Sequence, residues 1–408
     1  MSANLIAGLG AGLLLLIAFA FSTNRRKIRF RTVISALLLQ GAIGALVLYL
    51  PIGRDILAAL STAITGLLAY SATGIEMVFG PLVSESVGFS FALNVLPVVI
   101  FFSALMSVLY HIGIMQWVVR IVGVALDTVL SSGRVVSLNA AANIFVGQTE
   151  APLIIRPYLD KITQPQLFAI MTSGLASVAG TVLAAYAQIG ISVEYLLAAS
   201  FMAAPGGLLM ASIIMPGDDD RDEAQTIVKA SSERERHANV VMAAAVGAKD
   251  GLQLALNIGA MLIAFVSLIA LLNGLIAFIF GLFGLEGITI QYLLGLLLSP
   301  LMMALSIPIA EAQAAGAIVG EKLVINEFVA YLTLSGSLEA FSPRSQAILT
   351  IALCGFANLS SVGILLGGLG SLVPDRMAEI ARFGLRAVLA GSLSNLMSAA
   401  IAGMLFTG

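Results

Sequence analysis

The stretch Asn143-Ile-Phe-Val-Gly-Gln-Thr-Glu-Ala-Pro152 places amide, hydroxyl and carboxylate side chains within a chain that is otherwise strongly apolar. Polar and ionisable groups at membrane depth cost free energy, so they indicate a functional site by default. A second polar cluster follows at Asn326-Glu327 and Asn358-Leu-Ser-Ser361. Two such clusters in matching places predict a solute-binding site between two halves of a membrane protein.

The composition supports lipid as the solvent of this chain. Of its 408 residues, 59% are hydrophobic and 10% are charged, and the mean hydropathy is +1.04. A soluble domain carries about 25% charged residues. The net charge of −2 gives no electrostatic reason to expect a nucleic acid partner. The single cysteine, Cys354, excludes an intrachain disulfide.

Apolar segments of about 20 residues predict an all-α polytopic membrane protein with eight transmembrane helices. The predicted spans are 4–22, 33–50, 93–114, 166–190, 195–215, 252–283, 387–406 and the polar-interrupted 346–370. Residues 55–85 are apolar but interrupted by Gly66, Thr73-Gly74 and Pro81, so we expect helices in the membrane interface there. We expect no cleaved signal peptide, because the basic cluster follows the first apolar segment.

Three remaining segments are polar or charged. Residues 120–160 and 303–343 are long and contain scattered polar side chains, which predicts two re-entrant hairpins. Such hairpins are tolerated only where they are buried in protein or line a watery cavity. Residues 216–251 contain Asp218-Asp-Asp-Arg-Asp-Glu223 and Glu233-Arg-Glu-Arg236, which is typical of a solvated loop.

The distribution of basic residues orients this layout. With Arg25, Arg26, Lys27, Arg29 and Arg31 in the cytoplasm, 17 of the 20 basic residues fall inside, as the positive-inside rule requires. Only Arg54, Lys322 and Arg344 fall outside. Both termini are then predicted to face outward.

An internal repeat follows from the same count of crossings. Residues 166–180 and 346–361 each begin after a polar turn and reach small polar residues near their middle. A hairpin with one glutamate, Glu150 or Glu327, precedes each of them. The two segments cross in opposite directions, which predicts an inverted repeat with two broken helices around a midplane site.

The polar side chains each have a binding interpretation and a structural alternative. Glu150 and Glu327 would accept hydrogen bonds from a vicinal diol, or would cap a helix end or neutralise Lys322. Gln148 and Thr149 would pair with the edge of a heterocycle, or satisfy the backbone of a hairpin tip.

In the second cluster, Asn358 and Ser361 would share a helix face for a ligand, or serve helix packing. Phe356 would lie against a flat ring, or belong to the core. Asn143 and Ser177, with the carbonyls of Val146 and Val178, offer hard oxygens to a monovalent cation; on the residues alone, packing is the better interpretation of that pair.

Catalytic motifs are absent from the sequence, so we expect no enzyme. Neither His111 nor His237 begins an H-E-x-x-H zinc motif, and no G-x-S-x-G elbow occurs. Residues 316–323 resemble a phosphate loop but lack its G-K-[ST] ending.

Three motifs resemble the concentrative nucleoside transporter family. They are Gly147-Gln-Thr-Glu-Ala-Pro-Leu153, Lys322-Leu-Val-Ile-Asn-Glu-Phe-Val-Ala-Tyr331 and Ala352-Leu-Cys-Gly-Phe-Ala-Asn-Leu-Ser-Ser361, with Leu366-Gly-Gly-Leu-Gly370 after the last. With the pattern of spans, the resemblance covers nearly the whole chain. The chain length and short N-terminus are similar to the bacterial, sodium-coupled branch.

This resemblance implies a homotrimer whose protomers combine a scaffold with a moving part. The implied division is 1–115 as largely scaffold, 116–215 as the first repeat core, 216–251 as a charged cytoplasmic loop, 252–302 as a scaffold span with an interfacial helix, and 303–408 as the second repeat core.

The resemblance also implies the roles of the site residues. Gln148, Thr149 and Glu150 would face the nucleobase, and Val182 and Phe356 would line it. Glu327, Asn358 and Ser361 would hold the ribose. The sodium ligands would be the side chains of Asn143 and Ser177 and the carbonyls of Val146 and Val178, where Val178 stands in a place that isoleucine can also occupy.

The function implied is import of nucleosides such as uridine by symport with sodium, in the bacterial inner membrane and by an elevator-like movement. A proton-coupled nucleoside symporter is the alternative within this class, with Glu150 or Glu327 carrying the proton. A channel or a membrane scaffold without alternating access is the alternative from another class.

Overall fold

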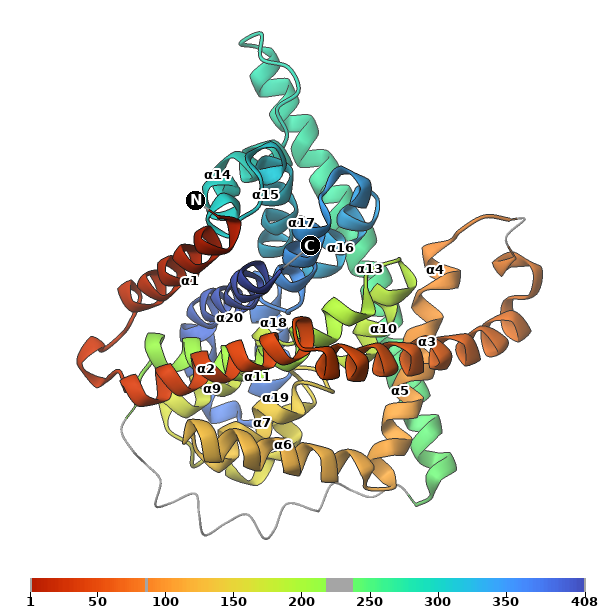
Figure 1. Cartoon of the computed structure of the whole chain (residues 1–408). Helices are drawn as coiled ribbons and strands as arrows, with labels where there is room; N and C mark the ends of the chain where they lie inside the picture. The colour runs from red at the N-terminus through yellow and green to blue at the C-terminus, as the bar shows by residue number, and fades with distance from the viewer. Residues whose placement is uncertain (1, 85–86, 218–237, 407–408) are drawn as a thin grey trace.

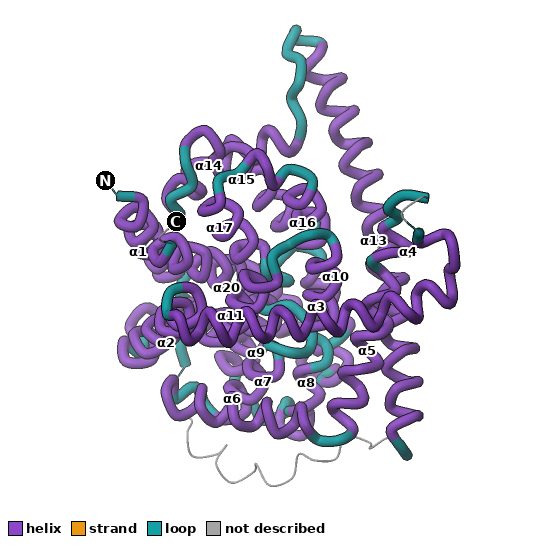
Figure 2. Tube along the Cα trace, turned by 45° about the vertical axis from the view of Figure 1, so that its right-hand side comes forward, coloured by secondary structure: helices purple, strands orange, loops and turns teal. Residues whose placement is uncertain are grey.

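The computed structural model describes residues 2–84, 87–217 and 238–406, and within these ranges every regular element is a helix (Figure 1, Figure 2). Eight helical stretches of this described part are long and apolar enough to cross a membrane. They are Ala3–Ala20 (α1), Phe30–Leu48 (α2), Pro51–Val83 (α3, Pro51–Phe79, with η2, Gly80–Val83), Phe91–His111 (α4, Phe91–Asn94, and α5, Leu96–His111), Gln164–Gln188 (α9 and α10), Val193–Ile214 (α11), Val240–Gly281 (α13) and Pro374–Leu405 (η5, Pro374–Arg376, and α20, Met377–Leu405).

The number of these stretches equals the predicted number of spans, although length and composition alone count α3, which was predicted to lie in the membrane interface, and leave out the predicted polar-interrupted span 346–370. The region predicted as interfacial helices forms one continuous helix, α3, which passes through Gly66 and Gly74 without a break. No other atom lies within 4 Å of a side chain added at either glycine. Neither glycine therefore marks the end of a helix. Helix α3 ends at Gly80, where φ is +55°.

Two helices begin before the starts of their predicted spans. Helix α13 begins at Val240, inside the predicted loop 216–251, because Asn239 caps it by accepting a hydrogen bond from the Met242 N–H at 2.8 Å. Helix α20 begins at Met377, ten residues before the predicted span. The charged runs at 218–223 and 233–236 lie outside the described residues.

The first hairpin is shorter than its predicted range of 120–160. Residues Ile114–Leu130 form a separate amphipathic helix, α6, which ends where Ser131 and Gly133 take positive φ angles. The hairpin itself, called hairpin 1, covers residues 134–158 and contains α7 (Arg134–Ala142), α8 (Ala151–Ile154) and η3 (Arg156–Tyr158).

The second hairpin, called hairpin 2, covers residues 309–335 and contains α15 (Ile309–Val324) and α16 (Glu327–Ser335). The preceding helix, α14 (Ile290–Ala304), meets α15 at a bend of 119°. A short turn, η4 (Leu338–Ala340), leads out of the hairpin.

Both predicted helix breaks are present. Helix α9 (Gln164–Ala176) is separated from α10 (Gly180–Gln188) by Ser177–Ala179, which has extended backbone at both ends. Helix α17 (Pro343–Leu353) is separated from α18 (Ser361–Gly367) and α19 (Leu369–Leu372) by residues 354–360. The predicted span 346–370 is therefore interrupted, as its polar residues indicated.

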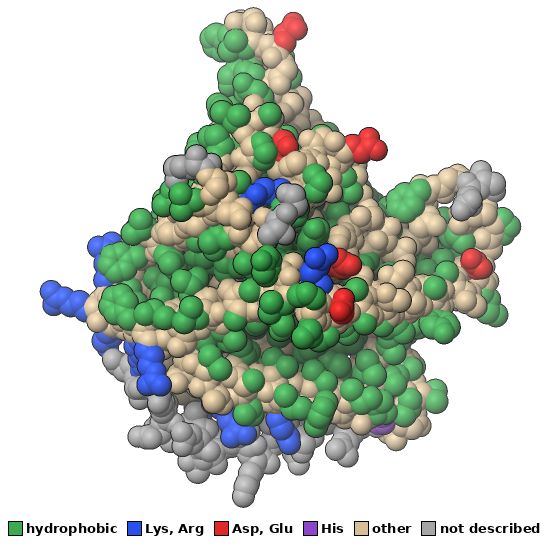
Figure 3. Space-filling model, in the orientation of Figure 1, with side chains coloured by type: hydrophobic (Ala, Val, Ile, Leu, Met, Phe, Trp, Pro, Cys, Tyr) green, Lys and Arg blue, Asp and Glu red, His purple; other side chains and the backbone are tan. Residues whose placement is uncertain are grey.

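The broken helix α9–α10, α11 and α20 form the interior of the molecule. In their most apolar windows, 83 to 89% of the residues are buried, whereas none is buried in the corresponding window of α13. Figure 1 shows α13 along the outside of the molecule, and Figure 3 shows a surface that is largely hydrophobic. On that face most basic side chains gather along the left and lower edges, in agreement with a charge-segregated membrane protein.

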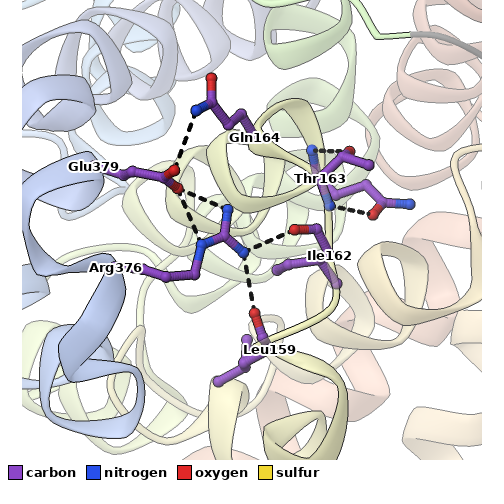
Figure 4. A network of polar contacts seen from close by, with 7 residues as sticks. Leu159, Ile162, Thr163, Gln164, Arg376 and Glu379 are labelled. Carbon is purple, nitrogen blue, oxygen red and sulfur yellow. Dashed lines mark hydrogen bonds and ion pairs between the residues drawn. The ribbon is translucent and has the colours of Figure 1, made fainter.

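A polar network joins the segment that follows hairpin 1 to η5 and the start of α20 (Figure 4). Arg376 donates hydrogen bonds to the carbonyls of Leu159 and Ile162 at 3.1 and 2.8 Å and forms an ion pair with Glu379 at 2.7 Å. Glu379 also accepts from Gln164 at 3.1 Å. The chain leaving hairpin 1 is thereby held against the start of the last helix.

Candidate functional site

Hairpin 2 presents a buried carboxylate at the start of a helix. The Asn326 side chain caps α16 by accepting a hydrogen bond from the Val329 N–H at 2.9 Å. The next residue, Glu327, is 5% exposed. A helix N-terminus favours negative charge, because its N–H groups and the aligned peptide dipoles are positive there.

Three of the residues predicted to hold one ligand lie in a single hydrogen-bonded network. The Asn358 amide donates to Glu327 Oε2 at 3.0 Å. The backbone N–H and the hydroxyl of Ser361 donate to Asn358 Oδ1 at 2.9 and 3.0 Å. Residues 31 to 34 positions apart are therefore joined because the break before α18 faces hairpin 2.

Tyr186 is a fourth member of this network, and the sequence interpretation did not include it. Its hydroxyl donates to Glu327 Oε1 at 3.0 Å, and its ring packs on those of Phe328 and Tyr331 with centroid distances of 5.2 and 4.4 Å. In the sequence, this residue could have been noticed as a tyrosine among the small residues of α10, nine positions after Ser177. The sequence did not show that α10 contacts hairpin 2.

Lys322 differs from both of its predicted settings. The charge count placed it on the outer side, in contrast to the cytoplasmic basic residues, yet it is only 2% exposed and lies in the interior. Within the described residues it forms no ion pair with Glu327; its ammonium donates instead to the Ala352 carbonyl at 2.8 Å and to Asn395 Oδ1 at 2.7 Å. The positive-inside rule applies to loops, and this lysine belongs to a buried helix.

The tip of hairpin 1 is fixed against the break between α9 and α10. The Gly180 N–H donates to the Phe145 carbonyl at 3.0 Å. The Glu150 carboxylate is exposed and accepts from the Gly147 N–H at 3.2 Å, which satisfies its own hairpin. Within the described part of the chain no hydrogen bond joins Glu150 to Glu327 or to its partners Tyr186 and Asn358, so the two carboxylates do not form one hydrogen-bonded array.

The other predicted ligand contacts surround the two breaks. Gln148 and Val182 are buried, and Thr149 is half-buried against Gly368, where an added Cβ would lie 2.5 Å from the threonine methyl. The Phe356 N–H donates to the Ser177 carbonyl at 3.1 Å, so the two breaks contact each other directly.

Oxygen atoms near hairpin 1 fit a hard monovalent cation. Asn143 Oδ1 is buried, and among the described residues it has no hydrogen-bond partner. A Cβ added at Gly174 would lie 3.8 Å from this oxygen. The Gly174 carbonyl accepts a hydrogen bond from the Ser177 hydroxyl at 3.1 Å. An acceptor without a donor at the end of a half-helix favours a positive ligand.

Comparison with known proteins identifies the relatives of this chain. Residues 9–82 and 195–403 match the models for the N-terminal and C-terminal parts of Na+ dependent nucleoside transporters, and residues 92–193 match a model described as nucleoside recognition. The transporter YutK of Bacillus subtilis is 50% identical over 98% of this chain and 99% of its own. The nucleoside permease NupC of Helicobacter pylori is 48% identical over 98% and 97%.

Solved structures agree with this relationship. The structure of CNTnw in an inward-facing substrate-bound state has a TM-score of 0.94 and 48% identity, and covers 99% of this chain and 98% of that one. A variant of CNTnw in a state described as intermediate 2 has a TM-score of 0.96 and 49% identity, with 99% of each chain covered. The chain therefore belongs to the Na+ dependent nucleoside transporter family, as its hairpin motifs, its helix breaks and its near full-length matches all indicate.

Proposed function

We propose that this protein imports nucleosides such as uridine across the bacterial inner membrane by symport with sodium. The observation that carries the proposal is the buried network of Glu327, Asn358 and Ser361, in a chain of this transporter family. A carboxylate at the start of α16 and an amide in the facing helix break match the two adjacent hydroxyls of a ribose.

In this proposal the ribose replaces part of the existing network. Its hydroxyls donate to the Glu327 carboxylate, and Asn358 and Ser361 hold that carboxylate and the sugar in register. The cost of the buried charge is offset by donors on both carboxylate oxygens, from Tyr186 and Asn358. Charge-assisted hydrogen bonds of this kind contribute roughly twice as much as neutral ones.

The nucleobase would lie toward hairpin 1. Gln148 supplies an amide with paired donor and acceptor character, and Thr149 and Glu150 supply a hydroxyl and a carboxylate. Val182 and Phe356 would cover the faces of the base. The exposed position of Glu150 supports access of this side to solute.

Sodium would bind where hairpin 1 meets the break of the first repeat. Its ligands would be the side-chain oxygens of Asn143 and Ser177 and the carbonyls of Val146 and Val178. The bound ion would neutralise the carbonyl end of α9 and order the hairpin tip that carries Gln148. Sodium would thereby raise the affinity for the nucleoside.

Alternating access would come from an elevator-like shift of the two repeat cores, 116–215 and 303–408, against a scaffold of 1–115 and 252–302. The contrast between buried interior helices and the exposed α13 supports this division. A homotrimer would cover part of the exposed helices, lipid would cover the rest, and both termini would face the periplasm.

Uptake of radiolabelled uridine into sealed proteoliposomes tests the proposal. An inward sodium gradient should drive accumulation above the external concentration, and replacement of sodium by choline should abolish that accumulation. Recovery of unchanged uridine would exclude chemical conversion. Equilibration without accumulation would contradict the proposal and favour a channel.

A proton-coupled nucleoside symporter is the alternative, because the exposed Glu150 carboxylate beside the hairpin tip is a titratable group in the proposed path. Uptake that follows an inward pH gradient and ignores sodium would favour this alternative. A requirement for sodium at zero pH gradient would exclude it.

A further inference from the structure

A buried lysine lies at the helix break of the second repeat, in the place where the first repeat is proposed to bind sodium. Lys322, at the last turn of α15, donates to the Ala352 carbonyl at 2.8 Å and to Asn395 Oδ1 at 2.7 Å. Asn395 on α20 in turn donates to the carbonyls of Ala176 and Cys354 at 2.6 and 2.9 Å. The Lys322 ammonium and the Asn395 amide therefore donate hydrogen bonds to the carbonyl ends of both α9 and α17.

These carbonyls need donors because the chain breaks next to them. In an intact helix the Ala352 carbonyl would accept from the N–H of Phe356, but that N–H donates to Ser177 instead. The Ala176 carbonyl would accept from Gly180, whose N–H donates to Phe145. Each half-helix thus ends in unsatisfied carbonyls at the negative end of its dipole.

The two repeats correspond at a constant spacing. Glu150 and Glu327 are 177 positions apart (327 − 150), and so are Ser177 and Cys354, the residues that follow α9 and α17 (354 − 177). At the same spacing, Lys322 corresponds to Phe145 (322 − 177), which lies between the proposed sodium ligands Asn143 and Val146.

We propose that Lys322 is a built-in cation of the second repeat, whose ammonium stabilises the end of α17 as sodium stabilises the end of α9. This inference rests on the proposed function, because the sodium site of the first repeat belongs to it. Lys322 is a positioning residue: it holds the break that contains Asn358 and leads into Ser361, and it lies five positions before Glu327 in the sequence. One repeat would then be ordered by a bound ion and the other permanently.

The close packing around Asn395 supports a fixed arrangement. A side chain at Gly355 would place its Cβ 2.2 Å from Asn395 Oδ1, so only glycine permits this approach. The acceptor atom of Asn395 is thereby aimed at Lys322, and its donor atom at the two helix ends.

Four substitutions of Lys322 distinguish the contribution of its charge from that of its hydrogen bonds. Lys322→Arg keeps the charge, Lys322→Gln keeps a donor without charge, Lys322→Met keeps only the volume, and Lys322→Ala leaves a space. Uridine affinity in saturating sodium is measured for each by calorimetry, with the melting temperature recorded separately. Lys249→Gln, an exposed change on α13, is the matched control and should leave the affinity within twofold of the original.

We expect Lys322→Arg to bind uridine at least tenfold more tightly than Lys322→Gln or Lys322→Met. Propylammonium, which replaces the missing atoms, should tighten binding by Lys322→Ala at least fivefold, and the neutral 1-propanol should not. Equal affinities of the Arg and Gln variants, or equal rescue by the two small molecules, would overturn the proposal.

Folding provides a second measurement. Isolation of folded Lys322→Arg, where the neutral variants fail to fold, also supports a charge requirement; equal melting temperatures together with equal affinities contradict it. If the unmodified protein shows no sodium-dependent uridine binding, the proposed function fails. In that case the melting temperatures alone test the requirement for charge at position 322, and the Arg variant should melt at a higher temperature than the Gln variant.

Discussion

Glu327 is the residue on which the proposed ribose site depends most, because both of its carboxylate oxygens accept hydrogen bonds in a buried place. Glu150 differs: it is exposed, and its carboxylate bonds its own hairpin backbone. Two glutamates in corresponding positions therefore have unequal environments. Since removal of a buried acceptor leaves its donors without partners, substitutions at Glu327 should have the larger effect.

The change Glu327→Gln should weaken uridine binding by about 1.5–3 kcal/mol, the scale of a hydrogen bond to a charged group. This corresponds to an increase in Kd of about 10- to 150-fold. Calorimetry with uridine and with its 2′,3′-dideoxy analogue measures the effect. The loss should be small for the analogue, and Glu339→Gln, at an exposed glutamate, should leave both affinities unchanged.

Tyr186 orients the Glu327 carboxylate, so its hydroxyl should influence affinity without contacting the base. Tyr186→Phe should weaken uridine binding by about 0.5–1.5 kcal/mol, the net contribution of a typical hydrogen bond. Tyr331→Phe is the control, because the Tyr331 hydroxyl donates to the Thr350 carbonyl at 2.7 Å. Equal losses in the two variants would show that the loss of any buried hydroxyl in this cluster, and not the bond to Glu327 in particular, is responsible.

Among the elements, the junction of hairpin 1 with α20 depends on a single guanidinium. Arg376→Ala removes hydrogen bonds to two carbonyls and the ion pair with Glu379, and should destabilise the protein by about 1.5–3 kcal/mol. The melting temperature in detergent should fall relative to Arg386→Ala, an exposed change on α20. An unchanged melting temperature would mean that packing alone holds hairpin 1.

The helices themselves show which sequence signals are reliable in an apolar chain. Small polar residues correctly predicted both breaks, at 177–179 and 354–360. Isolated glycines wrongly predicted breaks in α3, since nothing in its surroundings uses the space they leave. A break needs partners for the freed N–H and carbonyl groups, as the bond from Gly180 to Phe145 provides.

For the whole molecule, coupling between sodium and nucleoside must be reciprocal. If saturating sodium lowers the Kd of uridine by some factor, saturating uridine must lower the apparent Kd of sodium by the same factor. Calorimetric titrations of each ligand, with and without the other, measure both factors. Asn143→Ala, which removes a proposed sodium ligand, should reduce both together; unequal factors in the unmodified protein would mean that a further ion takes part.

The sequence by itself determined the helical membrane class, the number of spans, the family, and the segments that contain the helix breaks. These properties follow from local composition and from short motifs, and neither depends on how the chain is arranged in three dimensions. Only the tertiary structure decided that Tyr186 reaches Glu327, that Lys322 is buried against Ala352 and Asn395, and that Glu150 remains exposed. The physical reason is that a freed helix end accepts any donor that packing brings near, and packing between α10, hairpin 2 and α20 joins residues far apart in the sequence.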